Sequence, residues 1–166
     1  AYQIDISGGG NVAPPVRKLS PMSYSRTLHN SVVLPNGQVV VVGGMAYSIL
    51  FSDDQAVMAP ELWDPATETF MTMKPMQVPR TYHSFALLLP DARVIVGGGG
   101  LCGACAANHP DVEVLTPPYL LNGDGSPATR PTIASAPATA SAGGTITVGT
   151  GSAVAMLLVF LAMAID

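Results

Sequence analysis

The sequence predicts an all-β fold, and three observations support that prediction. Glycine and proline occur 17 and 15 times among 166 residues. Charged residues make up only 11% of the chain, whereas hydrophobic residues make up 48% and fall largely into short runs. Many glycines and prolines between short apolar runs are typical of a β protein with many turns rather than of helices. The third observation is an internal repeat, which also indicates the architecture.

The repeat joins two motifs at one interval. Residues 26–29 read Arg-Thr-Leu-His and residues 80–83 read Arg-Thr-Tyr-His, while the double glycine at 43–44 recurs at 97–98. Both intervals are 54 residues (80 minus 26, 97 minus 43). A period near ~50 with a double glycine after a β-branched run is typical of kelch repeats, in which each repeat forms one four-stranded propeller blade. The sequence therefore predicts two blades of a β-propeller.

The first repeat predicts four strands. They are expected at residues 31–34, 38–42, 61–65 and 69–71, with a turn at 35–37 and a long loop at 45–58. The continuous β-branched run in the second of these strands predicts that both of its faces are covered. Trp63 is expected to anchor the packing of the blade rather than to contact a ligand.

The second repeat predicts three strands, at residues 84–89, 93–96 and 111–116, around a turn at 90–92. No fourth strand follows, because Pro117 and Pro118 interrupt the pattern. A closed propeller often completes its last blade with a strand from the beginning of the chain. The second repeat is therefore predicted to be the final blade.

The composition changes after residue 121. A turn cluster at 122–125 leads into a linker that ends at Pro131, and two short Thr/Ile-rich strands are expected within 132–148, around Gly143 and Gly144. We therefore assign residues 1–121 to the propeller, 122–131 to a linker and 132–166 to the start of a small β-sandwich. Two blades and part of a sandwich bury too little apolar surface, since repeat folds need about three units for stability.

Charge and hydropathy exclude two classes of partner. The net charge is −4 and the seven Lys and Arg residues are scattered, whereas a nucleic-acid surface needs clustered cations. The apolar run at 156–165 is half the length of the roughly 20 residues that a membrane helix needs. It is interpreted as a buried strand or a misread gene end. Because the chain opens on Ala1 within an alternating segment, we expect it to be cut from a larger protein.

Tyr82 and His83 are the candidate metal ligands, because a phenol and an imidazole lie together where a propeller strand begins. Adjacent strand residues point to opposite faces, so both side chains reach one metal only at a strand end or a bulge. The first repeat carries Leu28 and His29 at the matching positions. A histidine here is therefore also explained by a role in the blade fold alone, and Tyr82 is the informative difference.

Two loops carry further candidates. Cys102 and Cys105 form a CxxC motif, which can hold zinc, act as a redox pair or close a small disulfide loop. A lone pair is a poor zinc site and no βαβ pattern surrounds it, so a disulfide is the default in a secreted protein. His109 is read as a loop hydrogen-bonding residue rather than a ligand. Phe51 is either a loop anchor or a wall of a substrate pocket.

These motifs resemble, in order, the last two kelch blades of the galactose oxidase family. The resemblance rests on Arg-Thr-Tyr-His-Ser at 80–84, Leu-Leu-Leu-Pro-Asp at 87–91, the glycine-rich stretch with CxxC at 97–105, and Ala-Thr-Arg-Pro at 128–131. It covers roughly residues 26–148. Glyoxal oxidases share the Arg-x-Tyr-His-Ser element but usually lack the glycine-rich CxxC stretch, which favours the galactose oxidase branch.

The resemblance implies a seven-bladed propeller followed by an immunoglobulin-like domain, in a secreted enzyme. It implies one copper ion held by two tyrosines and two histidines, and oxidation of a primary alcohol, such as a sugar, to an aldehyde while O₂ becomes H₂O₂. Tyr82 matches the axial tyrosine that accepts the alcohol proton, and His83 matches one histidine ligand. Phe51 falls on an aromatic wall of the pocket. Cys102 and Cys105 match a family disulfide.

The departures from the family pattern matter equally. The crosslinked Cys–Tyr radical pair is expected before Ala1, and no histidine follows His109 to supply the second imidazole. The chain alone is therefore expected to be inactive. Two alternatives remain: a non-catalytic kelch module that binds carbohydrate or protein, and a broken gene product that does not fold.

Overall fold

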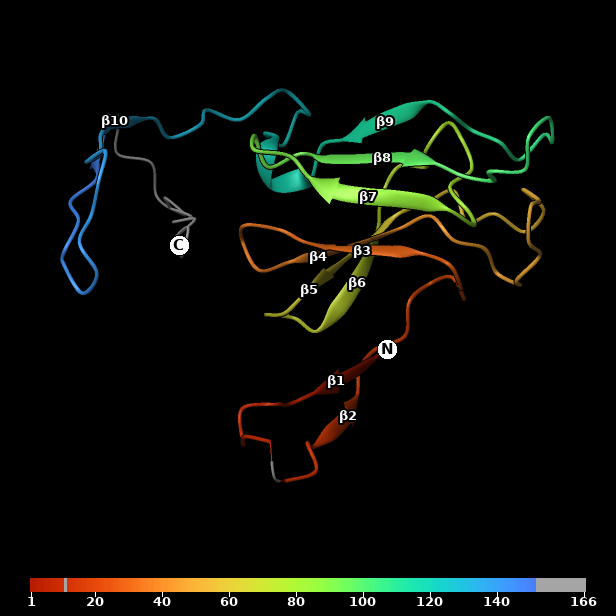
Figure 1. The fold of residues 1–166 in the computed structure, drawn as a ribbon, viewed down its shortest axis with the longest axis horizontal. Helices are drawn as coiled ribbons and strands as arrows, with labels where there is room; N and C mark the ends of the chain where they lie inside the picture. The colour runs from red at the N-terminus through yellow and green to blue at the C-terminus, as the bar shows by residue number, and fades with distance from the viewer. Residues whose placement is uncertain (11, 152–166) are drawn as a thin grey trace. The chain divides into compact units, whose positions relative to one another are not determined.

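The computed structural model describes residues 1–10 and 12–151, and its main chain is almost entirely antiparallel strands and loops (Figure 1). A single-turn 3₁₀ helix, η1 (Pro118–Leu120), is the helical element of the described residues. The chain forms two compact units, which meet in sequence between Leu115 and Thr116. The all-β prediction is confirmed, and the predicted domain boundaries at 121 and 131 stay a prediction.

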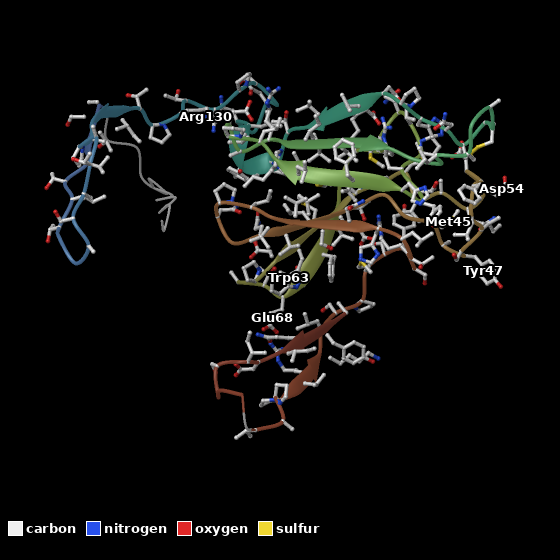
Figure 2. All side chains as sticks on the ribbon, in the orientation of Figure 1. Met45, Tyr47, Asp54, Trp63, Glu68 and Arg130 are labelled. Carbon is white, nitrogen blue, oxygen red and sulfur yellow. A yellow bond between two sulfur atoms is a disulfide. The ribbon has the colours of Figure 1, made fainter. Side chains whose placement is uncertain are left out.

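The first blade is a four-stranded antiparallel sheet in the order β3-β4-β5-β6. Its strands are β3 (Asn30–Val33), β4 (Val39–Val42), β5 (Glu61–Asp64) and β6 (Thr69–Thr72). Each lies within two residues of its predicted position. Val40 and Val42 on one face of β4 have no exposed surface and Val41 on the other face is 6% exposed, which confirms that both faces of this β-branched strand are covered there. Trp63, labelled in Figure 2, lies on β5 opposite Phe70 of β6 and is half-buried.

The second blade has three strands in the order β7-β8-β9. They are β7 (Ser84–Leu88), β8 (Val94–Gly98) and β9 (Val112–Leu115), and no fourth strand of the described residues joins them. This agrees with the prediction that the pattern stops after three strands. The two blades are neighbours: β3 contacts β7, and Asn30 Nδ2 donates hydrogen bonds to the backbone oxygen of Ser84 at 3.3 Å and to its hydroxyl at 3.2 Å.

The expected equivalence of the two double glycines is wrong by one residue. Gly43 and Gly44 both adopt positive φ, at 70° and 82°. In the second blade the corresponding left-handed pair is Gly98 and Gly99, because Gly97 is still within strand β8, opposite Phe85. The structure thus shifts the second blade by one position relative to the sequence repeat.

The first blade contains a buried ion pair between an arginine and a glutamate. Arg26 Nη2 donates to Glu61 Oε1 at 2.7 Å, and both side chains are fully buried. Glu61 also accepts the backbone N–H groups of Ser23 and Tyr24. The carboxylate therefore fixes the chain that enters the blade, and its charge is neutralised by the arginine.

The second blade repeats this arrangement with more exposed acids. The Arg80 side chain is buried and lies 3.3 Å from Asp111 Oδ2 and 3.6 Å from Glu113 Oε2. Glu113 accepts the backbone N–H groups of Gln77 and Val78, which lie three and two residues before Arg80. Glu61 accepts the N–H groups at the matching positions before Arg26. The side chains of Asp111 and Glu113 are 51% and 23% exposed, so solvent shares this charge.

The N-terminal residues form a hairpin of β1 (Tyr2–Ile4) and β2 (Val16–Lys18). Arg17 of this hairpin pairs with Glu68, which lies in the β5–β6 turn. Both side chains are about half exposed, so the ion pair adds little stability.

In the second unit, β10 (Ile133–Ser135) pairs with β11 (Gly149–Thr150). The prediction that both strands lie within 132–148 is wrong for the second strand. Gly144 N donates to Ser141 O in a tight turn, but the ladder forms only where Thr150 comes opposite Ile133. The apolar run at 156–165 lies outside the described residues. Within the described residues, no helix is long and apolar enough to cross a membrane.

Candidate functional site

Tyr82 and His83 lie in a turn immediately before β7, and their rings face each other. The ring centroids are 3.7 Å apart and the planes differ by 30°. His83 has a φ of 66°, in the left-handed region that few non-glycine residues occupy. This conformation breaks the alternation of a strand, so two adjacent side chains point the same way. Tyr82 and His83 therefore lie at a strand end, where two adjacent side chains can reach one metal.

The backbone of Gly100 fixes the His83 ring. His83 Nδ1 lies 2.8 Å from the carbonyl oxygen of Gly100, and the Gly100 N–H donates to the carbonyl of Tyr82 at 2.7 Å. Because a carbonyl only accepts, Nδ1 carries the proton in this contact. Nε2 of the neutral ring then has a free lone pair, which is the arrangement of a metal-ligating histidine.

Gly100 is in this position because no side chain fits there. Its φ is 76°, and an added Cβ would lie 2.8 Å from Asn108 Cα and closer still to the backbone of Ala107. The glycine run at 97–100 was read from the sequence as part of a family motif. The specific role of Gly100 in holding His83 was not predicted.

Phe51 reaches the two rings from the first blade, in the loop between β4 and β5. Its ring is edge-on to Tyr82, with centroids 5.3 Å apart and an angle of 79°, and its centroid is 6.1 Å from that of His83. Phe51 is 46% exposed and has a φ of 58°. The structure thus brings together all three residues that the sequence analysis singled out for a metal or substrate role.

Cys102 and Cys105 form a disulfide, with Cα atoms 5.6 Å apart. It closes a small loop between β8 and β9. His109, at the end of the same loop, makes a hydrogen bond from Nε2 to Asp53 Oδ2 at 2.9 Å. The side chain of His109 therefore acts as a loop hydrogen-bonding group, as expected, but its partner Asp53 was not foreseen.

The donor set fits half of a copper site. A phenol oxygen and an imidazole nitrogen are ligands that Cu(II) accepts. Among residues 1–10 and 12–151, no group of three or more His, Cys, Asp or Glu side chains could hold a metal ion. Tyr82 and His83 fit the ion as two of its ligands, and a complete site requires others.

Comparisons with known proteins show the family of the chain. The sequence profile of the glyoxal oxidase N-terminus family matches residues 12–106, which is more than half of the chain. The chain belongs to the glyoxal oxidase and galactose oxidase family. It is 41% identical over 155 residues to a galactose oxidase of Gibberella zeae, covering 93% of this chain. It is 34% identical over 120 residues to an aldehyde oxidase of Arabidopsis thaliana, covering 66%.

A solved structure of this family is also similar. A fungal alcohol oxidase of the AA5 family, in complex with copper, has a TM-score of 0.72 and 51% identity, over 75% of this chain. The chain spans 23% of the galactose oxidase, 20% of the aldehyde oxidase and 26% of the alcohol oxidase chain. It therefore represents about a quarter of the oxidase relatives that it matches.

Proposed function

We propose that this chain supplies part of the active site of a copper-radical oxidase, which oxidises a primary alcohol to an aldehyde. The observation that carries the proposal is the left-handed turn at His83, which stacks the Tyr82 and His83 rings while Gly100 occupies Nδ1. A histidine that serves packing alone needs no such arrangement. The family supports the same chemistry, since its relatives include an alcohol oxidase in complex with copper.

Each residue has a proposed role. Tyr82 would hold the metal through its phenol oxygen and accept the hydroxyl proton of the substrate as a general base. His83 holds the metal through Nε2. Copper, when bound, acidifies the alcohol and takes part in electron transfer. The other two ligands, and the Tyr–Cys group that would supply the radical chemistry, are proposed to come from outside this chain, so we expect the isolated chain to be inactive.

The reaction is balanced by oxygen. The alcohol loses two protons and two electrons to become an aldehyde, and O₂ gains them to become H₂O₂. Phe51, edge-on to Tyr82, is proposed to form an apolar wall against which the substrate lies. A primary alcohol or a carbohydrate fits this description equally.

The rival function is a kelch module that binds protein or carbohydrate without copper. It treats His83 as a fold residue like His29. The backbone argues against that equivalence, because the left-handed residue of the first blade is Leu28, with a φ of 56°, and not His29. His83 therefore occupies a backbone position that carries no histidine in the first blade.

The proposed whole protein has a seven-bladed propeller, of which residues 1–121 form the end, a linker at 122–131 and an immunoglobulin-like domain from 132. We propose that it is secreted. The Cys102–Cys105 disulfide supports this location, since disulfides persist in oxidising compartments.

The experiment replaces Tyr82 by Phe in the full-length, copper-loaded protein and measures H₂O₂ from a panel of primary alcohols. Loss of a general base should reduce turnover by about 10²- to 10⁴-fold. Tyr47→Phe is the control, because Tyr47 is 73% exposed and has no proposed role in the site. If the unmodified protein yields no H₂O₂ from any alcohol, the oxidase proposal fails.

A further inference from the structure

Two loops from different blades meet beside the candidate site through one side-chain pair. His109 belongs to the loop between β8 and β9, and Asp53 belongs to the loop between β4 and β5, 56 positions earlier. Their side chains are 2.9 Å apart and only 19% and 30% exposed. Figure 1 shows both loops at the same end of the two blades. The contact is therefore partly shielded from solvent.

The loop that carries Phe51 has few other supports near its tip. Its base is closed by the Ala46 N–H donating to Gln55 O at 2.8 Å. Towards the second blade, Thr81 Oγ1 donates to Ser52 O across a long 3.4 Å. Tyr47, which precedes the tip, points into solvent (Figure 2). Asp53 is two residues from Phe51, and within the described residues its 2.9 Å contact with His109 is shorter than the link from Thr81 to Ser52.

The loop that carries His109 is itself well held. The His109 N–H donates to Gly99 O at 3.3 Å, and the Asn108 N–H donates to Cys105 O at 3.2 Å within the disulfide loop. The same loop contains Gly100, whose carbonyl fixes the His83 ring. One hydrogen-bonded segment therefore contacts His83 directly and is linked to the loop of Phe51 through His109 and Asp53.

The Asp53 carboxylate has an energetic cost at this position. Its Oδ1 is enclosed and has no hydrogen-bond partner among the described residues. An enclosed, unpaired carboxylate oxygen destabilises the folded chain, and the contact of Oδ2 with His109 offsets that effect. The pair thus lies two residues from Phe51, which has a φ of 58° in the left-handed region.

We propose that His109 and Asp53 are a positioning pair that holds the Phe51 ring against Tyr82 and so sets the affinity for the alcohol substrate. This inference rests on the proposed oxidase function. The pair does not touch the reacting atoms. It acts through the backbone of residues 51–53, and its loss releases Phe51 from the edge of Tyr82.

The test uses the full-length oxidase with Asp53→Ala, His109→Ala and the double variant. For one alcohol that the unmodified enzyme oxidises, KM should rise about tenfold in each variant while kcat changes much less, since ground-state positioning is lost. The double variant should resemble the single variants, because all three lose the same interaction. His109→Gln, which keeps a donor at this reach, should restore most of the affinity. Asp54→Ala, an exposed neighbour, is the control.

Hydrogen exchange supplies a readout that does not depend on activity. Amides of residues 46–56 should exchange faster in Asp53→Ala and His109→Ala than in Asp54→Ala. Unchanged KM and unchanged exchange would overturn the proposal, as would strictly additive effects of the two single changes. If the unmodified protein oxidises no alcohol, the oxidase function fails, while the exchange data still decide whether the pair holds the loop.

Discussion

The two blades begin with nearly the same four residues but use them differently. In the first blade, Arg26 and the left-handed residue Leu28 are two positions apart; in the second, Arg80 and the left-handed residue His83 are three positions apart. One additional residue therefore lies between the buried arginine and the turn. With this residue, the turn of the second blade presents the stacked rings of Tyr82 and His83, whereas the turn at Leu28 in the first blade serves packing.

Backbone hydrogen bonds locate the extra residue. Thr27 exchanges hydrogen bonds with Met45, and Tyr82 accepts the N–H of Gly100. These pairs are 55 residues apart (82 minus 27, 100 minus 45), and not 54. The backbone counterpart of Tyr82 is thus Thr27. The equivalence of Leu28 with Tyr82, read from the sequence repeat, is replaced by one of Leu28 with His83.

This difference shows that a shared motif need not be a shared structural position. His29 and His83 match in sequence, but the backbone counterpart of His29 is Ser84. The two histidines can therefore be separated by experiment. The following predictions use one blade as the control for the other.

The largest expected difference concerns the two buried arginines. Glu61→Gln removes the charge that neutralises a fully buried Arg26, and should lower the free energy of unfolding by about 3–5 kcal/mol. Glu113→Gln leaves the buried Arg80 paired with Asp111, whose carboxylate is half exposed, and should cost about 1–2 kcal/mol. Denaturant unfolding of the full-length variants measures both. Equal losses would show that burial does not distinguish the blades.

The next difference compares two glycines with positive φ in the loop between β8 and β9. Gly100→Ala should destabilise by more than about 2 kcal/mol, because its Cβ meets backbone and displaces the carbonyl that holds His83. Gly103 has a similar φ of 70° but open space around it, so Gly103→Ala should cost only about 1 kcal/mol. Thermal midpoints and copper content report the two effects. A copper content that stays full in Gly100→Ala would contradict the proposed support of His83.

The smallest effect concerns pH. Burial, followed by the charge of Arg26, lowers the pKa of His29 below its usual value. In the unfolded chain the pKa of this imidazole is about 6.5. As the pH falls through that value, the unfolded state takes up a proton before the folded state does. Stability should therefore fall as the pH drops from 7.5 to 5, and His29→Gln should reduce the slope. Thermal midpoints at both pH values measure it, and an unchanged slope would remove His29 as the cause.

The sequence predicted much of the fold because the strands follow local patterns. The β-branched run that became β4 and the turn at 35–37 are set by residue type and spacing. The register of the second blade was not predictable from the repeat, since one inserted residue changes no motif and is visible only in the hydrogen bonds of Tyr82 and Gly100. Phe51 meets Tyr82 through long-range packing.

The sequence analysis named the candidate ligands of the site but not the residues that support them. Tyr82 and His83 carry recognisable side chains in a recognisable motif. Gly100 acts through its carbonyl oxygen, and Asp53 acts through a contact between two loops. Neither role can be recognised from the neighbouring residues in the sequence. The His109–Asp53 pair joins residues from separate blades, which no spacing rule connects.

The measurement that tests the account most directly is the copper content of full-length His83→Gln and His29→Gln after loading and dialysis. Because Nε2 of His83 is the proposed ligand, His83→Gln should lose most of its copper. His29→Gln should keep the same copper content as the unmodified protein, for which the proposal expects one copper per molecule. If the two variants retain the same amount of copper, the two histidines are equivalent after all, and His83 is a residue of the blade fold.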